Sequence, residues 1–131
     1  MLILLLHTLI EATVAFLFLF YPGAGDLVPG FGTSEGQSYE LLMQMYGLSA
    51  AFLAALTLIA YFSRANRVLM LTITGSLSVF HLVMAGIQAF GNPDPRAGLL
   101  HFLLGIFLGS LYMRYRKEAW VEREHERARL N

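Results

Sequence analysis

The sequence has 131 residues, of which 56% are hydrophobic and 14% are charged, and its formal net charge is zero. One small domain cannot hide so much apolar surface by folding on itself, so the composition argues against a water-soluble globule and predicts a lipid bilayer as solvent. The absence of cysteine excludes disulfides, thiolate metal sites, iron–sulfur clusters and cysteine nucleophiles.

Four apolar blocks are long enough to cross a bilayer as α-helices. A hydrocarbon core of ~30 Å needs ~20 mostly apolar residues, because a helix rises ~1.5 Å per residue. We therefore expect spans at about residues 2–21, 40–62, 68–90 and 98–115. Apart from Glu11, the charged residues lie outside these blocks or at their ends, which is typical of membrane proteins.

Lysine and arginine are concentrated on one side of the predicted spans. Arg64 and Arg67 lie in the second connection, and most of the others lie at or after the end of the fourth span, whereas Arg96 lies on the opposite side. Cytoplasmic loops accumulate lysine and arginine. We therefore predict a multi-pass protein of the bacterial inner (plasma) membrane with both termini in the cytoplasm.

The segment after the fourth span is charged and rich in helix formers. Opposite charges three residues apart, such as Glu124 and Arg127, favour a helix that continues into the cytosol. The predicted fold is therefore all-α: an integral membrane four-transmembrane-helix bundle, residues 1–115, with a cytoplasmic helical C-terminal extension, residues 116–131.

Small residues mark the faces on which these helices are expected to pack. Helices in lipid associate through close backbone approach and interhelical hydrogen bonds. Gly47, Ala51 and Ala55 recur every four residues in the second span, and Gly105 and Gly109 form a small-xxx-small pair in the fourth. The partner on either face can be a neighbouring helix of the same chain or another subunit.

Glu11 is the most informative residue, because an ionised carboxylate near the middle of a span is costly. We expect it to be protonated, paired or in contact with water. Counting ~1.5 Å per residue from the outer helix ends puts Glu11 and His81 at ~14–15 Å depth, and His101 and Gln44 at ~5–6 Å. His7 lies one turn from Glu11 on the same face. The sequence thus allows a His7–Glu11–His81 cluster, with His101 and Gln44 nearer the outside.

Three functions are open for this cluster. It can be structural, with hydrogen bonds between helices that contribute ~0.6–2 kcal/mol each. It can be a transition-metal or haem site, with Glu11, His81 and His101 as candidate ligands. It can also be a pocket for a lipid-soluble ligand such as a quinone, whose reduction requires proton exchange with His and Glu. The sequence requires none of these cofactors.

The sequence lacks the patterns of common enzymes and nucleic-acid-binding proteins. The loop GAGDLVPGFG, residues 23–32, has glycines but neither the Lys-Ser/Thr pair of a P-loop nor a preceding strand. No Ser/His/Asp order, paired carboxylates for hydrolysis or nucleic-acid motif is present. We therefore lean against an enzyme, assign no catalytic residue and expect no nucleic-acid partner.

The plan of the chain resembles the DoxX-like group of small bacterial four-helix membrane proteins. The resemblance lies in LLLHTLIEATVAFLFLFYPG, residues 4–23, and in RAGLLHFLLGIFLG, residues 96–109. It implies a role such as that of members associated with quinone-linked oxidoreductases. The glycine usual in the middle of that family's first helix is missing between Leu2 and Tyr21, and no catalytic residue is carried over.

Together these observations predict a small membrane protein that acts by association. It would be an accessory subunit of a larger membrane complex, such as a quinone-linked redox complex, or a homo-oligomer built on the Gly105/Gly109 face. Its partners would be the lipid bilayer and other membrane subunits or itself. The alternative function is a membrane-embedded ligand, quinone, haem or metal site built on Glu11, His81 and His101.

Overall fold

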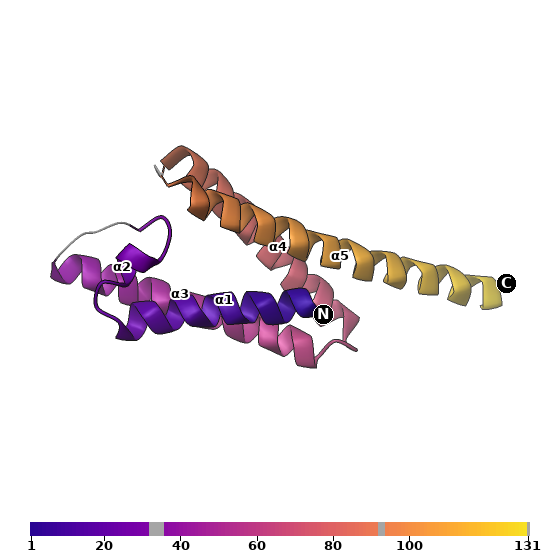
Figure 1. Cartoon of the computed structure of the whole chain (residues 1–131). Coiled ribbons are helices and arrows are strands. Elements are labelled where there is room, and N and C mark those ends of the chain that lie inside the picture. The colour runs from indigo at the N-terminus through magenta and orange to yellow at the C-terminus, as the bar shows by residue number, and fades with distance from the viewer. Residues whose placement is uncertain (32–35, 92–93, 131) are drawn as a thin grey trace.

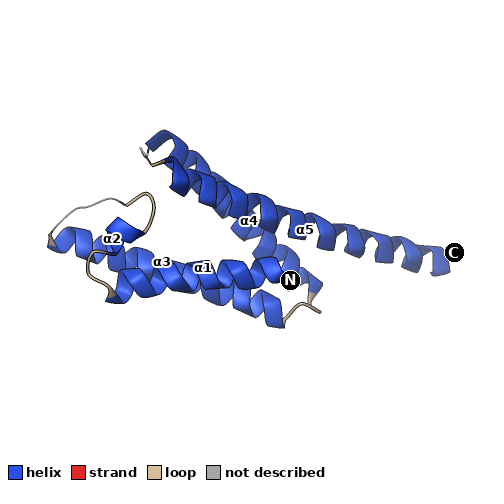
Figure 2. Ribbon diagram, in the orientation of Figure 1, coloured by secondary structure: helices blue, strands red, loops and turns tan. Residues whose placement is uncertain are grey.

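The structure, a computed structural model, describes residues 1–31, 36–91 and 94–130 (Figure 1). These residues contain five helices and no strand (Figure 2): α1 (Leu2–Phe20), α2 (Ala24–Leu27), α3 (Gln37–Phe62), α4 (Arg67–Gly91) and α5 (Pro95–Leu130). Four of them are long and apolar enough to cross a membrane. The predicted all-α class and the four long apolar helices are therefore confirmed.

The helix boundaries follow local chemistry. Tyr21 precedes Pro22, whose ring disfavours helical backbone at the residue before it, and α1 ends there with the Tyr21 N–H donating to the Leu17 carbonyl at 2.9 Å. At the start of α4, Oδ1 of Asn66 accepts the backbone N–H of Leu69 at 3.1 Å, which is a side-chain cap. These ends are set by neighbouring residues and do not need tertiary contacts.

The longest helix, α5, starts three residues before the predicted fourth span and has 36 residues. Asp94 accepts the backbone N–H of Arg96 at 3.0 Å, and Pro95 suits the first helical position because its missing N–H is not needed there. The predicted tail is helical, and Glu122 within it forms an ion pair with Arg67 at the start of α4.

The long helices form two antiparallel pairs. Helix α1 packs along α3 and α4 packs along α5, whereas contacts between the pairs are far fewer. Figure 1 shows the pairs close together near the N-terminus and the α3–α4 turn, and apart at the ends where α2 and the α4–α5 connection lie. The predicted bundle is therefore two helix pairs joined mainly near one end.

An apolar core closes the end where the pairs meet. It draws on all four long helices and consists of Leu4, Ala60, Met70, Ile73, Leu77, Leu108 and Leu111. Leu4, Ala60, Met70 and Leu108 have no exposed surface. We call this group the inner core.

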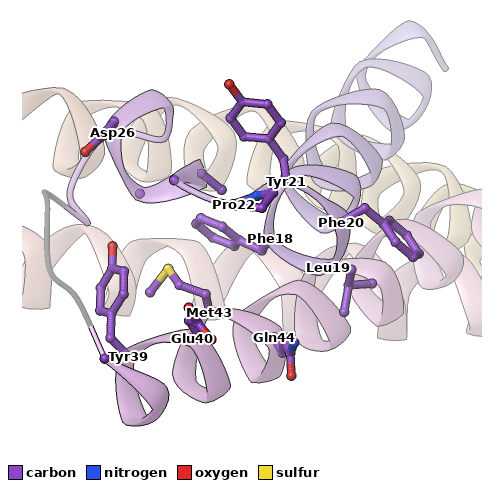
Figure 3. Close-up of a pocket in the computed structure, with 14 residues that line it drawn as sticks. Phe18, Leu19, Phe20, Tyr21, Pro22, Asp26, Tyr39, Glu40, Met43 and Gln44 are labelled. Carbon is purple, nitrogen blue, oxygen red and sulfur yellow. The ribbon is translucent and has the colours of Figure 1, made fainter.

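The opposite end of the α1/α3 pair has its own small cluster. Phe18 of α1, Ala24 of α2 and Met43 of α3 are buried against one another. Beside them lies a pocket of about 680 Å³ between the end of α1, helix α2 and the start of α3, whose lining also includes Asp26 and Glu40 (Figure 3).

Close packing within the first pair depends on a glycine. A Cβ at Gly47 would lie 2.9 Å from the side chain of Leu19 in α1, so no larger residue fits without movement. The predicted stripe does not continue through Ala51, which is half-buried, or Ala55, which is exposed. Four residues advance about 40° more than one turn, so a straight stripe must alternate steps of four and three. The buried face of α3 does so: Met43, Gly47, Ala50, Ala54 and Thr57.

The second pair uses the Gly105/Gly109 face inside the chain. A Cβ at Gly105 would lie 2.8 Å from the side chain of Leu82, and one at Gly109 would lie 2.8 Å from Oγ of Ser78. The hydroxyl of Ser78 donates to the Gly105 carbonyl at 2.8 Å. The homo-oligomer predicted on this face is therefore corrected, because α4 already occupies it.

Candidate functional site

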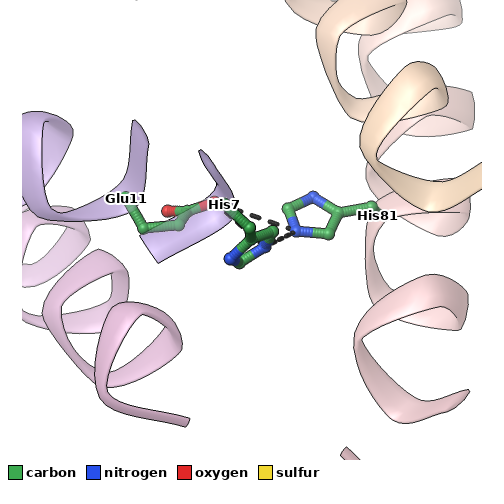
Figure 4. Close-up of side chains that lie close together, drawn as sticks. All are labelled: His7, Glu11 and His81. Atoms are coloured by element: carbon green, nitrogen blue, oxygen red, sulfur yellow. Dashed lines mark hydrogen bonds and ion pairs between the residues drawn. The ribbon is translucent and has the colours of Figure 1, made fainter. Parts of the chain in front are cut away.

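A polar cluster lies where α1 of one pair faces α4 of the other (Figure 4). His7 and Glu11 project from α1, and His81 projects from α4. The two histidines are 0% exposed and Glu11 is 7% exposed. Three side chains that bind metals and protons are thus held together away from solvent.

Helical periodicity places these residues. His7 and Glu11 are one turn apart and share the buried face of α1 with Leu4 and Ala15. His81 lies on the buried face of α4, which includes the inner-core residue Leu77 one turn earlier. The cluster therefore adjoins the inner core.

Three potential ligand atoms converge in this cluster. The Nε2 atoms of His7 and His81 are 2.6 Å apart. Oε1 of Glu11 lies 3.8 Å from each of these two nitrogens. The two imidazole rings meet edge to face, with their centroids 4.9 Å apart and an interplanar angle of 74°. The two Nε2 atoms thus face each other, with Oε1 of Glu11 at the same distance from both.

A third imidazole continues the row into α5. Nδ1 of His101 lies 2.9 Å from Nδ1 of His81, and the two rings are stacked with an interplanar angle of 29°. His81 is the central ring, with both of its nitrogens in contact with another histidine. A neutral imidazole has one N–H donor and one acceptor nitrogen. The tautomer of His81 therefore decides which of its two neighbours it donates to and which it accepts from.

One polar atom of the cluster has no hydrogen-bond partner among the residues that the structure describes. Nδ1 of His7 is buried and makes no hydrogen bond to any residue that the structure describes. A buried polar atom left unsatisfied costs about 1–3 kcal/mol. Such atoms in a native structure often mark a functional site or a group that is satisfied by a bound species.

The structure brings four of the five predicted site residues together. His7, Glu11 and His81 meet as the counted depths allowed. His101 was expected at a shallower level, but α5 begins at Pro95 instead of residue 98, which lowers His101 by about 4.5 Å relative to its helix end. The earlier helix start therefore accounts for about half of the expected difference of ~9 Å between the levels of His101 and His81.

Gln44 does not join the cluster. It is exposed and borders the pocket at the end of α1 shown in Figure 3, where no histidine is among the lining residues. The predicted grouping of Gln44 with His101 is corrected, because Gln44 is exposed near the start of α3 and lines this pocket instead.

The predicted ligand set of Glu11, His81 and His101 is also corrected. The two ring nitrogens of His81 point in different directions, so an ion at Nε2 cannot also be bound by His101, which contacts Nδ1. In the described part of the chain, His7, Glu11 and His81 are the one group of three possible ligands within 4.8 Å of one another. The spacing of four between His7 and Glu11 was the signal for this set.

A bis-histidine haem does not fit this geometry. Iron between two axial imidazoles would hold their nitrogens about 4 Å apart, with the macrocycle between them. The Nε2 atoms of His7 and His81 are 2.6 Å apart. The haem alternative is therefore set aside for this pair.

Comparison of the chain with protein-family models, curated proteins and solved structures gave no match. The resemblance to DoxX-like proteins stays a prediction. The chemistry of the site therefore rests on the geometry of its own residues.

Proposed function

We propose that this chain is an integral membrane protein that holds one divalent transition-metal ion between α1 and α4. Its ligands are Nε2 of His7, Oε1 of Glu11 and Nε2 of His81. The observation that carries this proposal is the convergence of these three buried atoms, which are 2.6, 3.8 and 3.8 Å apart.

The spacing is compatible with a metal ion, whereas hydrogen bonds within the cluster leave out the carboxylate. Zinc bound ~2.0–2.1 Å from each ligand in a tetrahedron sets two ligand atoms about 3.3 Å apart, so binding would move the two nitrogens about 0.7 Å apart and draw the carboxylate oxygen about 0.5 Å closer. His7 and His81 can share one proton, but a carboxylate oxygen at 3.8 Å is too far to hydrogen-bond to either nitrogen. An ion at the centre of the three atoms contacts all of them.

The donor set indicates the class of metal. Two imidazoles and one carboxylate, with no cysteine in the chain, match three-ligand zinc sites and the 2-His-1-carboxylate sites of non-haem iron(II). We therefore propose Zn²⁺ or Fe²⁺. Three protein ligands leave one coordination position of the metal open. The single carboxylate of Glu11 neutralises one of the two positive charges of the ion. We therefore expect a small anion such as hydroxide in the open position.

A bilayer supplies the surroundings of this centre. Only 28% to 39% of the residues in the most apolar stretch of each long helix are buried by the chain, so lipid is needed to cover the rest. The N-terminus, the α3–α4 turn and the α5 tail lie toward one end in Figure 1. Because lysine and arginine gather at this end, we propose that it faces the cytoplasm of a bacterial inner membrane.

The metal proposal is tested by titrating the detergent-solubilised protein with Zn²⁺ or Co²⁺ after removal of bound metal. We expect one ion per chain, and Co²⁺ should give visible absorption bands of a low-symmetry site with nitrogen and oxygen ligands. Glu11→Gln and His81→Ala should each weaken binding at least a hundredfold.

His125→Ala is the matched control, because this fourth histidine is exposed in the α5 tail and should not affect binding. Separate titrations with Zn²⁺ and with anaerobic Fe²⁺ distinguish the two metals. Equal binding by the wild type and Glu11→Gln, or no stoichiometric binding by the wild type, contradicts the proposal.

A second proposal is an accessory role in a quinone-linked membrane complex. It is favoured by an apolar hollow of about 560 Å³ whose lining includes Leu48 and Phe52 of α3 and Phe80 of α4. The ring of Phe80 lies edge to face with that of His81, with centroids 5.2 Å apart, so a lipid-soluble ligand in the hollow would lie near the histidines. Mass spectrometry of the protein isolated with its native lipids tests this role by identifying bound quinone and co-purified subunits. Isolation without either argues against it.

A further inference from the structure

We infer that His101 is a positioning residue of the metal centre, because its Nδ1 accepts the Nδ1–H of His81. The contact fixes the ring of His81 so that Nε2 faces His7 and Glu11. This inference rests on the proposed metal centre, but it concerns a residue outside the ligand set.

Metal binding through Nε2 fixes the tautomer of His81. Coordination uses the lone pair of Nε2, so the proton of the neutral ring must be on Nδ1. His81 is 0% exposed, so water does not accept this N–H. Nδ1 of His101 lies 2.9 Å away and is an acceptor at hydrogen-bond distance. Metal-binding histidines commonly donate their second N–H in this way, and the acceptor orients the ring.

The hydrogen bond from His81 also fixes the tautomer of His101. If Nδ1 of His101 accepts a hydrogen bond, the proton of its neutral ring is on Nε2. The same pair of tautomers leaves His81 Nε2 without a proton and free for a metal. For the neutral rings of His81 and His101, only this pair of tautomers is therefore compatible with metal coordination by Nε2 of His81.

Close packing of α5 on α4 brings His101 within reach of His81. Glycines flank His101 on the face packed against α4. A Cβ at Gly98 would lie 3.6 Å from the Ala85 carbonyl oxygen, and one at Gly105 would lie 2.8 Å from Leu82. The close approach of the two helices thus sets the His81–His101 contact, and the packing of α4 on α5 supports the metal centre.

Two substitutions at position 101 separate positioning from general packing. His101→Leu keeps a side chain of similar size but removes the acceptor nitrogen. In His101→Asn, Oδ1 takes nearly the place of Nδ1 and can accept the same N–H. We expect Leu to weaken Zn²⁺ binding 10- to 100-fold. Asn should restore the affinity to within about threefold of the wild type, and His125→Leu should leave it unchanged.

A spectroscopic measurement on the unmodified chain provides an independent test. In zinc-bound protein labelled with ¹⁵N-histidine, we expect a coupling across the hydrogen bond between Nδ1 of His81 and Nδ1 of His101. X-ray absorption of the zinc-bound His101→Leu protein should show the same number of nitrogen ligands as the wild type.

Several outcomes would overturn the inference while the metal centre stands. One is that the wild type and His101→Leu bind Zn²⁺ with equal affinity. Another is that His101→Asn binds Zn²⁺ as weakly as His101→Leu does. The third is that zinc-bound His81 has its proton on Nε2. Loss of a nitrogen ligand in His101→Leu would instead make His101 a ligand. Failure of the wild type to bind metal overturns the proposed function itself.

Discussion

Nε2 of His7 and Nε2 of His81 lie 2.6 Å apart although 74 positions separate these residues in the chain. The contact joins α1 of one helix pair to α4 of the other, next to the inner core. Because the pairs otherwise contact each other little, this buried polar contact holds together parts of the structure that apolar packing joins only near one end.

Removal of His7 should destabilise the metal-free protein. His7→Ala leaves Nε2 of His81 buried without its partner, which we expect to lower the free energy of unfolding by about 1–3 kcal/mol. Denaturation in mixed micelles with a chelator present measures the change. The double variant His7→Ala/His81→Ala should lose less than the sum of the single losses, because both remove the same contact. Fully additive losses would show that the two histidines do not interact.

Gly47→Ala should weaken the α1/α3 pair, whereas Gly86→Ala is a matched control. The new Cβ at position 47 would lie 2.9 Å from Leu19, whereas nothing lies within 4 Å of a Cβ at position 86. Both changes gain the same helix propensity, up to about 1 kcal/mol. We expect a net loss of about 1–2 kcal/mol at position 47, from crowding, and no loss at position 86. Equal unfolding free energies for the two variants would rule out this close contact.

Asp94 should make the stability depend on acid pH. Hydrogen bonds from the side chain of Arg96 lower the pKa of Asp94 from 3.8 to about 2. A carboxyl with a lowered folded-state pKa stabilises the fold above pH ~4 and loses this effect as the pH falls toward 2. Asp94→Asn keeps an oxygen that can cap α5 but removes the charge. The thermal midpoint should therefore fall less between pH 4 and pH 2 in this variant, and parallel curves would contradict the assignment.

The proposed orientation can be tested with single cysteines, because the chain has none. Ala65→Cys in the α3–α4 turn and His125→Cys in the tail are at exposed positions on the side proposed to be cytoplasmic. Ser38→Cys at the start of α3 is exposed on the opposite side. In intact cells, an impermeant maleimide should label Ser38→Cys only, and it should label all three after the membrane is opened. Labelling of His125→Cys in intact cells would reverse the topology.

The long helices could be predicted from the sequence because their causes are local. Apolar runs of sufficient length and nearby signals such as Pro22 and Asn66 set where helices start and end. The meeting of Glu11 with His81 was also predictable, because a helix has a fixed rise and the count of residues from its end gives an approximate level.

Only the tertiary structure decided which helices pair, that His101 contacts His81, and that Gln44 lies elsewhere. The rotation and tilt of each helix depend on contacts between residues far apart in the chain, such as Gly47 with Leu19 and Gly105 with Leu82. The periodicity of a single helix shows which residues share a face. It does not show which helix that face will meet, because that choice depends on how small and large side chains fit together across the interface.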